Sequence, residues 1–195
     1  NINQLPTMDG DEFFSMEREV AEEFCMGRVY LHWCRLQQDS PLMRKYRIKS
    51  IFPMTGIRES YRLNGVYQLT LEDILNGIGN QYKKKELVAF SDHPVDIHGS
   101  DHPGLRILDK PYGIPYSCLL PKNISNLLVA CRGSSFDRTA AASCRLSRTM
   151  IALGEAAGCS ASQCIDKNVS VHNIDINEVQ EALGIPGFIK NILLG

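Results

Sequence analysis

Four arginines lie around one short apolar run and the helix expected to follow it: Arg132, Arg138, Arg145 and Arg148. A guanidinium beside a helix N-terminus offers a fork of N–H donors and a permanent positive charge. Such a site suits a carboxylate, a phosphate or another group that becomes negative during a reaction. The alternative is that these arginines lie on a solvated surface.

Asp96 and His98 form a second candidate for chemistry. They stand two residues apart in a segment rich in Pro, Gly and Asp, where a carboxylate beside an imidazole can tune a proton donor near neutral pH. A solvated loop histidine is the alternative. His93, Asp101 and His102 lie nearby, but their spacing matches no standard ligand pattern, so we expect no metal site.

The helix after Arg145 carries a stretch with little side-chain bulk, namely Gly154, Ala156, Ala157, Gly158 and Ala161. Small residues let a backbone or a flat ligand approach closely, and the first turn near Ser147 supplies free N–H groups. Tight helix packing is the alternative. We expect the helix to pack through Gly154 and Gly158, so that Gly158→Leu overpacks the contact.

The elements that must position these residues follow from the hydrophobic pattern. The apolar run 127–130 predicts a buried, parallel strand that leads into the turn at Arg132. A helix over residues 143–166 follows. A last short helix is expected to begin at Asp175 and to end at residues 184–186, where a glycine and a proline stop it.

Upstream elements are also predicted. Apolar residues at three- and four-residue intervals indicate one amphipathic helix over residues 9–33, and residues 48–53 favour a short strand. The Asn-Gly dipeptide at 64–65 is a strong turn signal. Thr70, with an acidic residue three positions later, predicts an N-cap for a short helix over residues 71–75.

Residues 86–90 favour another strand, so helices and strands alternate along the chain. This alternation predicts an α/β or α+β fold. The chain has 195 residues, of which 44% are hydrophobic, enough for one substantial core or for part of a larger one.

The formal net charge of −1 provides no field for nucleic acid or for an anionic membrane. Seven cysteines without a CxxC pair favour packing roles in a reduced compartment. No run of about 18 apolar residues indicates a membrane span. We expect a cytoplasmic location. Because the chain begins at Asn1, the sequence leaves open whether a targeting segment lies upstream.

Four segments, in order, resemble the bacterial FAD-dependent oxidoreductases related to the succinate dehydrogenase and fumarate reductase flavoproteins. They are GIRESYRLNGVYQLTLEDIL from Gly56, PVDIHG from Pro94, YGIPYSCLLPKNISNLLVACR from Tyr112 and RLSRTMIALGEAAG from Arg145. The resemblance covers most of residues 56–185. It departs at Cys131, where the family commonly has glycine, and at Arg148, where it often has proline.

The resemblance implies the C-terminal part of an FAD/NAD(P)-binding Rossmann-like fold with part of its substrate domain. Residues 1–120 would belong to the substrate domain, and residues 121–195 would be the strand-helix segment that completes the FAD-binding domain. No GxGxxG fingerprint occurs in the sequence, so a missing N-terminal segment would hold the ADP half of FAD. The chain alone is therefore expected neither to hold FAD nor to be active.

The resemblance also assigns roles to residues. On the cofactor, Ala130, Arg132 and Gly133 would approach the ribitol, while Ser147, Arg148 and Thr149, with Gly154 and Ala157 behind them, would face the isoalloxazine. On the substrate side, the residues would be Arg58, Glu59, Asp96 and His98, with Arg145 close to the flavin or to a substrate anion.

The implied activity is hydride transfer between flavin and a small organic substrate. A cofactor-free remnant that serves as a structural or interaction module is the main alternative. A metal-dependent hydrolase that uses the loop around His98 is a third and weaker one.

Overall fold

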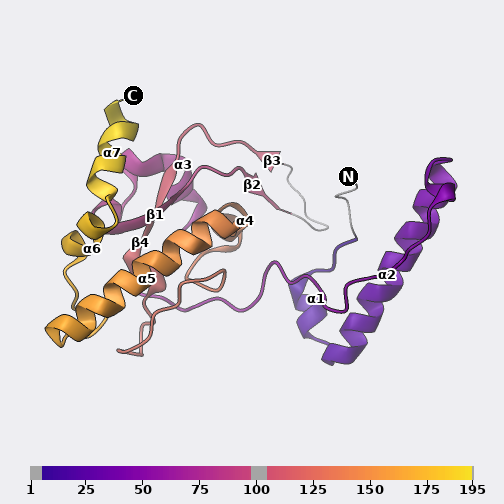
Figure 1. Cartoon of the computed structure of the whole chain (residues 1–195), viewed down its shortest axis with the longest axis horizontal. Helices are drawn as coiled ribbons and strands as arrows, with labels where there is room; N and C mark the ends of the chain where they lie inside the picture. The colour runs from indigo at the N-terminus through magenta and orange to yellow at the C-terminus, as the bar shows by residue number, and fades with distance from the viewer. Residues whose placement is uncertain (1–5, 98–104, 195) are drawn as a thin grey trace. The chain divides into compact units, whose positions relative to one another are not determined.

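The computed structural model describes residues 6–97 and 105–194. Contacts between Cα atoms divide the chain into two compact units, whose described parts are residues 6–57 and residues 58–97 with 105–194. Both are drawn in Figure 1, and each is described by itself. The division at residue 120 concerns the domains of the implied family and stays a prediction.

The first unit holds α1 (Gly10–Phe14), α2 (Arg18–Asp39) and a 3-10 turn, η1 (Met43–Lys45). The prediction of one helix over residues 9–33 was wrong. The chain leaves the helix at Ser15, whose Oγ donates a hydrogen bond to the carbonyl oxygen of Glu12. Glu17 is extended and starts α2, which continues to Asp39.

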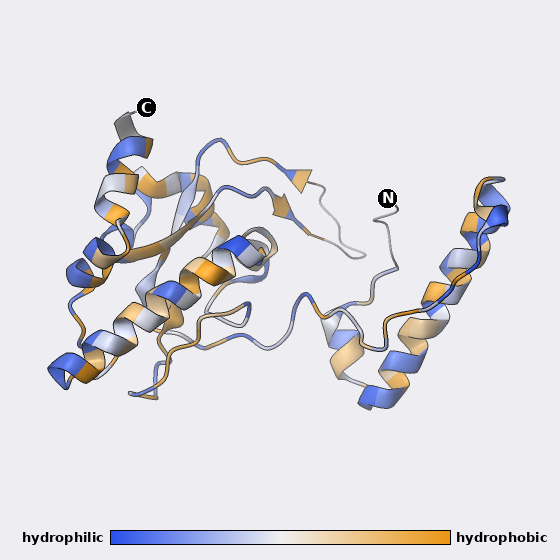
Figure 2. Ribbon diagram, viewed as in Figure 1, coloured by the Kyte–Doolittle hydropathy of each residue, from blue (hydrophilic) through white to orange (hydrophobic). Residues whose placement is uncertain are grey.

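Apolar and polar residues are interspersed along α2 (Figure 2). Within the described residues, α2 has one buried residue, Ala21. Its large apolar side chains Val20, Phe24 and Leu31 are exposed. Residues 48–53, predicted as a strand, form none, because no other described segment pairs with them.

The second unit contains two small antiparallel sheets. One pairs β1 (Leu87–Ser91) with β4 (Tyr112–Pro115), and the other pairs β2 (Val95–Asp96) with β3 (Leu105–Arg106). Its helices are α3 (Leu71–Asn80), α4 (Arg138–Cys144), α5 (Ser147–Lys167), α6 (Ile176–Ala182) and α7 (Ile185–Leu194), with 3-10 turns η2 (Lys84–Glu86) and η3 (Tyr116–Leu119). The predicted mixed α/β class is confirmed.

The core of this unit forms around β1 and β4, which lie beside α5 (Figure 1). Tyr112 and Ile114 of β4 are fully buried, as is Leu87 of β1. Both strands are buried along nearly their whole length, because helices cover them. From α5, Leu153 and Ala156 enter the same cluster.

The predicted capping box of α3 is confirmed. Thr70 Oγ1 accepts from the Asp73 N–H at 3.4 Å, and Asp73 Oδ2 accepts from the Thr70 N–H at 3.0 Å. The helix continues to Asn80, past a glycine at position 77 with φ of +67°. Aspartate thus serves here in the place that a capping box usually gives to glutamate.

The Asn-Gly dipeptide at 64–65 does not form the predicted turn. The chain stays extended, and the N–H groups of Leu63 and Val66 donate to the carbonyl oxygens of Gly133 and Leu120. A Cβ added at Gly65 would lie 2.5 Å from Ser135 Cβ. Glycine is needed here for close approach of two chain segments rather than for a turn.

The C-terminal helix predictions were partly confirmed. Asp175 begins α6, as expected, by accepting a hydrogen bond from the Asn177 N–H. Gly184, with φ of +68°, ends that helical run. Pro186 does not stop a helix, because it lies in the first turn of α7, where its missing N–H is harmless.

Candidate active site

Arg145 joins α4 to α5 and has both arms of its guanidinium occupied. The residue is only 9% exposed. Its Nη1 donates to Glu59 Oε1 at 3.1 Å, and its Nη2 donates to the carbonyl oxygen of Asp96 at 2.8 Å. The two acceptors come from distant parts of the sequence, so Arg145 fixes the extended segment at Glu59 and strand β2 to this junction.

Other charges gather around this ion pair. Arg138 Nε lies 3.9 Å from the second Glu59 oxygen, and Arg132 Nε donates to the Arg145 carbonyl oxygen at 3.1 Å. We call Arg58, Arg132, Arg138 and Arg145, with Glu59, the arginine cluster. Its cations outnumber its carboxylates even when Asp96 is included, so the cluster is net positive.

Burial lowers the pKa of Arg145. The charge of Glu59 opposes this shift, and the charge of Arg58 adds to it. Because arginine keeps its proton throughout the physiological range, the buried cation persists.

The N-terminus of α5 begins two residues after Arg145. Its N-cap, Leu146, makes no capping hydrogen bond through its side chain. Thr149, in the first turn, is 1% exposed, and its Oγ1 has no hydrogen-bond partner within the described residues. A helix of 21 residues thus begins two positions after a buried cation, with uncapped N–H groups and a buried, unsatisfied hydroxyl in its first turn.

Arg148 lies in the same turn but pairs with Asp92 through its Nη2. Both side chains are exposed, so the pair contributes little to stability. Ser147 is exposed as well. Of the predicted proton-transfer pair, Asp96 lies in β2, whereas His98 lies outside the described residues and its role stays a prediction.

The segment before the cluster is not the predicted buried strand. Residues 127–130 belong to neither sheet, and Leu127 is 41% exposed. The prediction was wrong because no described strand lies beside them. Residues Cys131 to Ser134 then form a turn. The Ser134 N–H closes it by donating a hydrogen bond to the Cys131 carbonyl oxygen at 3.0 Å. Ala130 and Gly133 flank Arg132 in this partly exposed stretch.

The predicted packing of α5 through its glycines was also wrong. Gly154 and Gly158 are exposed, and no atom lies within 4 Å of a Cβ added at either position. The buried side of α5 consists instead of Thr149, Leu153, Ala156, Ser160 and Gln163. Gly158→Leu would therefore not overpack the helix against a neighbour.

Gly154 and Ala157 lie in the middle of α5, well beyond its N-terminal turn. With a rise of 1.5 Å per residue, Gly154 lies roughly 10 Å along the axis from Ser147. The structure thus brings Arg132, Arg145 and Asp96 together, and it leaves Gly154 and Ala157 two to three turns along α5.

The resemblance named Glu59 on the substrate side, but nothing in the sequence indicated its contact with Arg145. Glu59 is 86 positions from Arg145, and no local pattern indicates a contact over that distance. Asp92, the partner of Arg148, was missed for the same reason. The only available signal was the Arg-Glu pair at 58–59 within one of the four resembling segments.

The assembled site can stabilise a negative charge on a ligand. Guanidinium groups, an uncapped helix N-terminus and a free hydroxyl all favour an anion or an electron-rich carbonyl. In the part of the chain that the structure describes, no three His, Cys, Asp or Glu residues are grouped to hold a metal ion. No described helix has the length and apolar character needed to cross a membrane.

The family described as FAD dependent oxidoreductase matches residues 12–183, which is most of the chain. Comparisons with curated proteins and with solved structures gave no match.

Proposed function

The chain belongs to the FAD dependent oxidoreductase family, and on this premise we propose that it forms the isoalloxazine and substrate side of a flavin site. The observation that carries the proposal is the junction at Arg145. There a buried cation, an uncapped helix N-terminus and the unpartnered Thr149 hydroxyl occur together.

These groups fit a flavin. An electron-rich carbonyl or a ring that gains negative charge would accept from the first N–H groups of α5 and from Thr149. The residues that would hold it are Ser147, Arg148 and Thr149, with the turn of Ala130, Arg132 and Gly133. When bound, the flavin supplies the redox chemistry, as a hydride exchanged with a small organic substrate.

The residues of this chain orient the reactants and stabilise charge. Arg145, held by Glu59 and by the Asp96 carbonyl oxygen, keeps its guanidinium fixed before any ligand arrives. A preorganised charge of this kind spends no energy on reorganisation during reaction. Arg58 and Arg132 add positive charge, which favours an anionic substrate such as a carboxylate.

We propose that a separate dinucleotide-binding segment completes the site. The sequence has no GxGxxG loop to hold a pyrophosphate. Residues 121–195 would then dock against that segment, and residues 1–120 would contribute to the substrate domain. The partly exposed stretch 127–130 and the exposed face of α5 at Gly154 and Gly158 are the surfaces available to it.

Thr149→Val tests the assignment of the α5 N-terminus. Valine has nearly the shape of threonine but no hydroxyl, so removal of a buried, unsatisfied group is expected to raise the free energy of unfolding by about 1 kcal/mol. Flavin affinity in protein that holds FAD is expected to fall. Urea denaturation and flavin fluorescence titration measure the two effects.

Thr70→Val is the matched control. It removes the N-cap of α3 and should lower the free energy of unfolding by about 1 kcal/mol without weakening flavin affinity. If Thr149→Val destabilised the protein and left flavin affinity unchanged, the hydroxyl would have a structural partner and the assignment would fail.

A further inference from the structure

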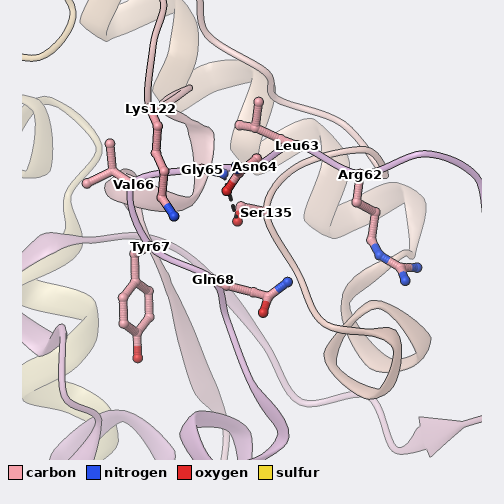
Figure 3. Close-up of a pocket in the computed structure, with 9 residues that line it drawn as sticks. All are labelled: Arg62, Leu63, Asn64, Gly65, Val66, Tyr67, Gln68, Lys122 and Ser135. Atoms are coloured by element: carbon pink, nitrogen blue, oxygen red, sulfur yellow. Dashed lines mark hydrogen bonds between the residues drawn. The ribbon is translucent and has the colours of Figure 1, made fainter.

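A pocket apart from the Arg145 junction lies along the segment 62–68, in which the chain bends at residues 66–67. Its volume is about 380 Å³. Lys122 and Ser135 reach it from other parts of the second unit (Figure 3). The lining contains no acidic side chain; its members are Arg62, Leu63, Asn64, Gly65, Val66, Tyr67, Gln68, Lys122 and Ser135.

Two cations of this lining have no acidic partner. Neither Arg62 nor Lys122 takes part in an ion pair among the described residues. In the view of Figure 3, the side chains of Gln68 and Ser135 lie between the ammonium of Lys122 and the guanidinium of Arg62. The two cations thus lie at opposite ends of the pocket, with the two neutral polar groups between them (Figure 3).

Ser135 provides a fixed polar group in the wall of the pocket. It is 1% exposed, and its Oγ accepts a hydrogen bond from the Gly65 N–H at 3.3 Å. Because that bond uses an oxygen lone pair, the hydroxyl hydrogen stays available for donation. The close approach of Gly65 to Ser135 leaves no room for a side chain at position 65 and keeps this wall in place.

The segment that carries the pocket is anchored on both sides. The N–H groups of Leu63, Val66 and Leu69 donate to the carbonyl oxygens of Gly133, Leu120 and Ser135. A ligand would therefore meet a preformed backbone, and only the ends of Arg62 and Lys122 would have to be ordered on binding. Preorganisation of this kind improves affinity, since less conformational entropy is lost.

We propose that this pocket binds the phosphate group of a small phosphate monoester. Near neutral pH such a group carries a charge of about −1.5 to −2 and has three acceptor oxygens, which matches two cations and the Ser135 and Gln68 donors. A carboxylate matches only one of the charges. A water molecule occupies roughly 30 Å³ in the liquid, so the cavity has room for a phosphate with a short carbon skeleton.

Titration of the 195-residue chain, followed by ³¹P NMR, tests the proposal without any flavin. Glycerol 3-phosphate and inorganic phosphate are the probes, with acetate as competitor, all at constant ionic strength because exposed charges are screened by salt. We expect saturable broadening of the phosphate signal. The double variant Arg62→Gln with Lys122→Gln should weaken binding at least tenfold, and Ser135→Ala should weaken it severalfold.

The matched control is Arg106→Gln with Lys190→Gln, which makes the same change in net charge at exposed positions of the same unit that do not line the pocket. It should leave binding unchanged. Tighter binding of glycerol 3-phosphate than of inorganic phosphate would identify an organic phosphate as the ligand, and equal binding would identify free phosphate.

Three results would overturn the proposal: no saturable binding of either probe, an equal loss in the control variant, or displacement by acetate at equal concentration. Because the assay needs neither FAD nor turnover, its failure would leave the proposed flavin site untouched. Failure of the flavin site would likewise leave this pocket untouched.

Discussion

Arg145→Ala is expected to lower the turnover of protein that holds flavin by roughly tenfold or more, which corresponds to about 1.4 kcal/mol of lost transition-state stabilisation. Alanine removes both the charge and the fork that Glu59 and the Asp96 carbonyl oxygen hold in place. Arg145→Lys keeps the charge but can reach only one of these acceptors well. Activity should therefore fall in the order wild type, lysine, alanine.

Steady-state kinetics of each variant, corrected for flavin content, measures this effect. Loss of Arg145 also leaves Glu59 without its nearest cation, so circular dichroism must show that each variant is folded. Lys190→Ala is the control, because Lys190 is exposed in α7 and has no part in the candidate site. If Arg145→Ala kept full turnover and normal flavin content while His98→Ala had no turnover, the Arg145 assignment would be wrong. The Asp96-x-His98 loop would then be the better candidate for the catalytic residues.

Asp137→Ala is expected to lower the free energy of unfolding by about 2 to 4 kcal/mol. One carboxylate oxygen of Asp137 accepts from the Ala140 N–H at 2.6 Å and caps α4. The other accepts from the Leu71 N–H at 3.0 Å in the first turn of α3. The variant thus loses an N-cap and a second charged hydrogen bond that joins two helices.

Urea denaturation of the chain gives this value directly. Asp175→Ala provides the comparison, because Asp175 caps only its own helix, α6, and its loss should lower the free energy of unfolding by about 1 kcal/mol. Asp137→Asn should fall between wild type and alanine, since the amide oxygen can still accept one bond. Equal losses for Asp137→Ala and Asp175→Ala would show that the contact with Leu71 contributes nothing.

Local features of this fold could be predicted from the sequence because neighbouring residues determine them. The capping box at Thr70, the strand close to residues 86–90 and the start of α6 at Asp175 depend only on side chains within a few positions. Each was predicted with at most a shift of one residue or a change in length.

Features that depend on distant partners could not be predicted in the same way. The Asn-Gly pair at 64–65 signals a turn, but the nearby Ser135 keeps the chain extended. Residues 127–130 have the composition of a buried strand, yet no described strand lies beside them. Composition alone did not show which side of α5 would be buried.

In the candidate site too, local features could be predicted from the sequence and contacts between distant residues could not. Arg145 could be selected because it lies at the start of the helix predicted over residues 143–166, and the structure places it where α4 ends and α5 is about to begin. Its partner Glu59 could not be selected from spacing, since the two residues are 86 positions apart. The unpartnered hydroxyl of Thr149 required coordinates, because sequence does not show which polar groups are satisfied.

The central claim is that this chain supplies one side of a flavin site and that a dinucleotide-binding segment supplies the other. The most direct measurement is the flavin absorption spectrum after gel filtration with FAD, recorded for the chain alone and for the chain joined to a GxGxxG-bearing segment of the same family. The account predicts no retained flavin for the chain alone and retained flavin for the joined protein. Stoichiometric flavin on the chain alone, or none on a folded joined protein, would contradict it.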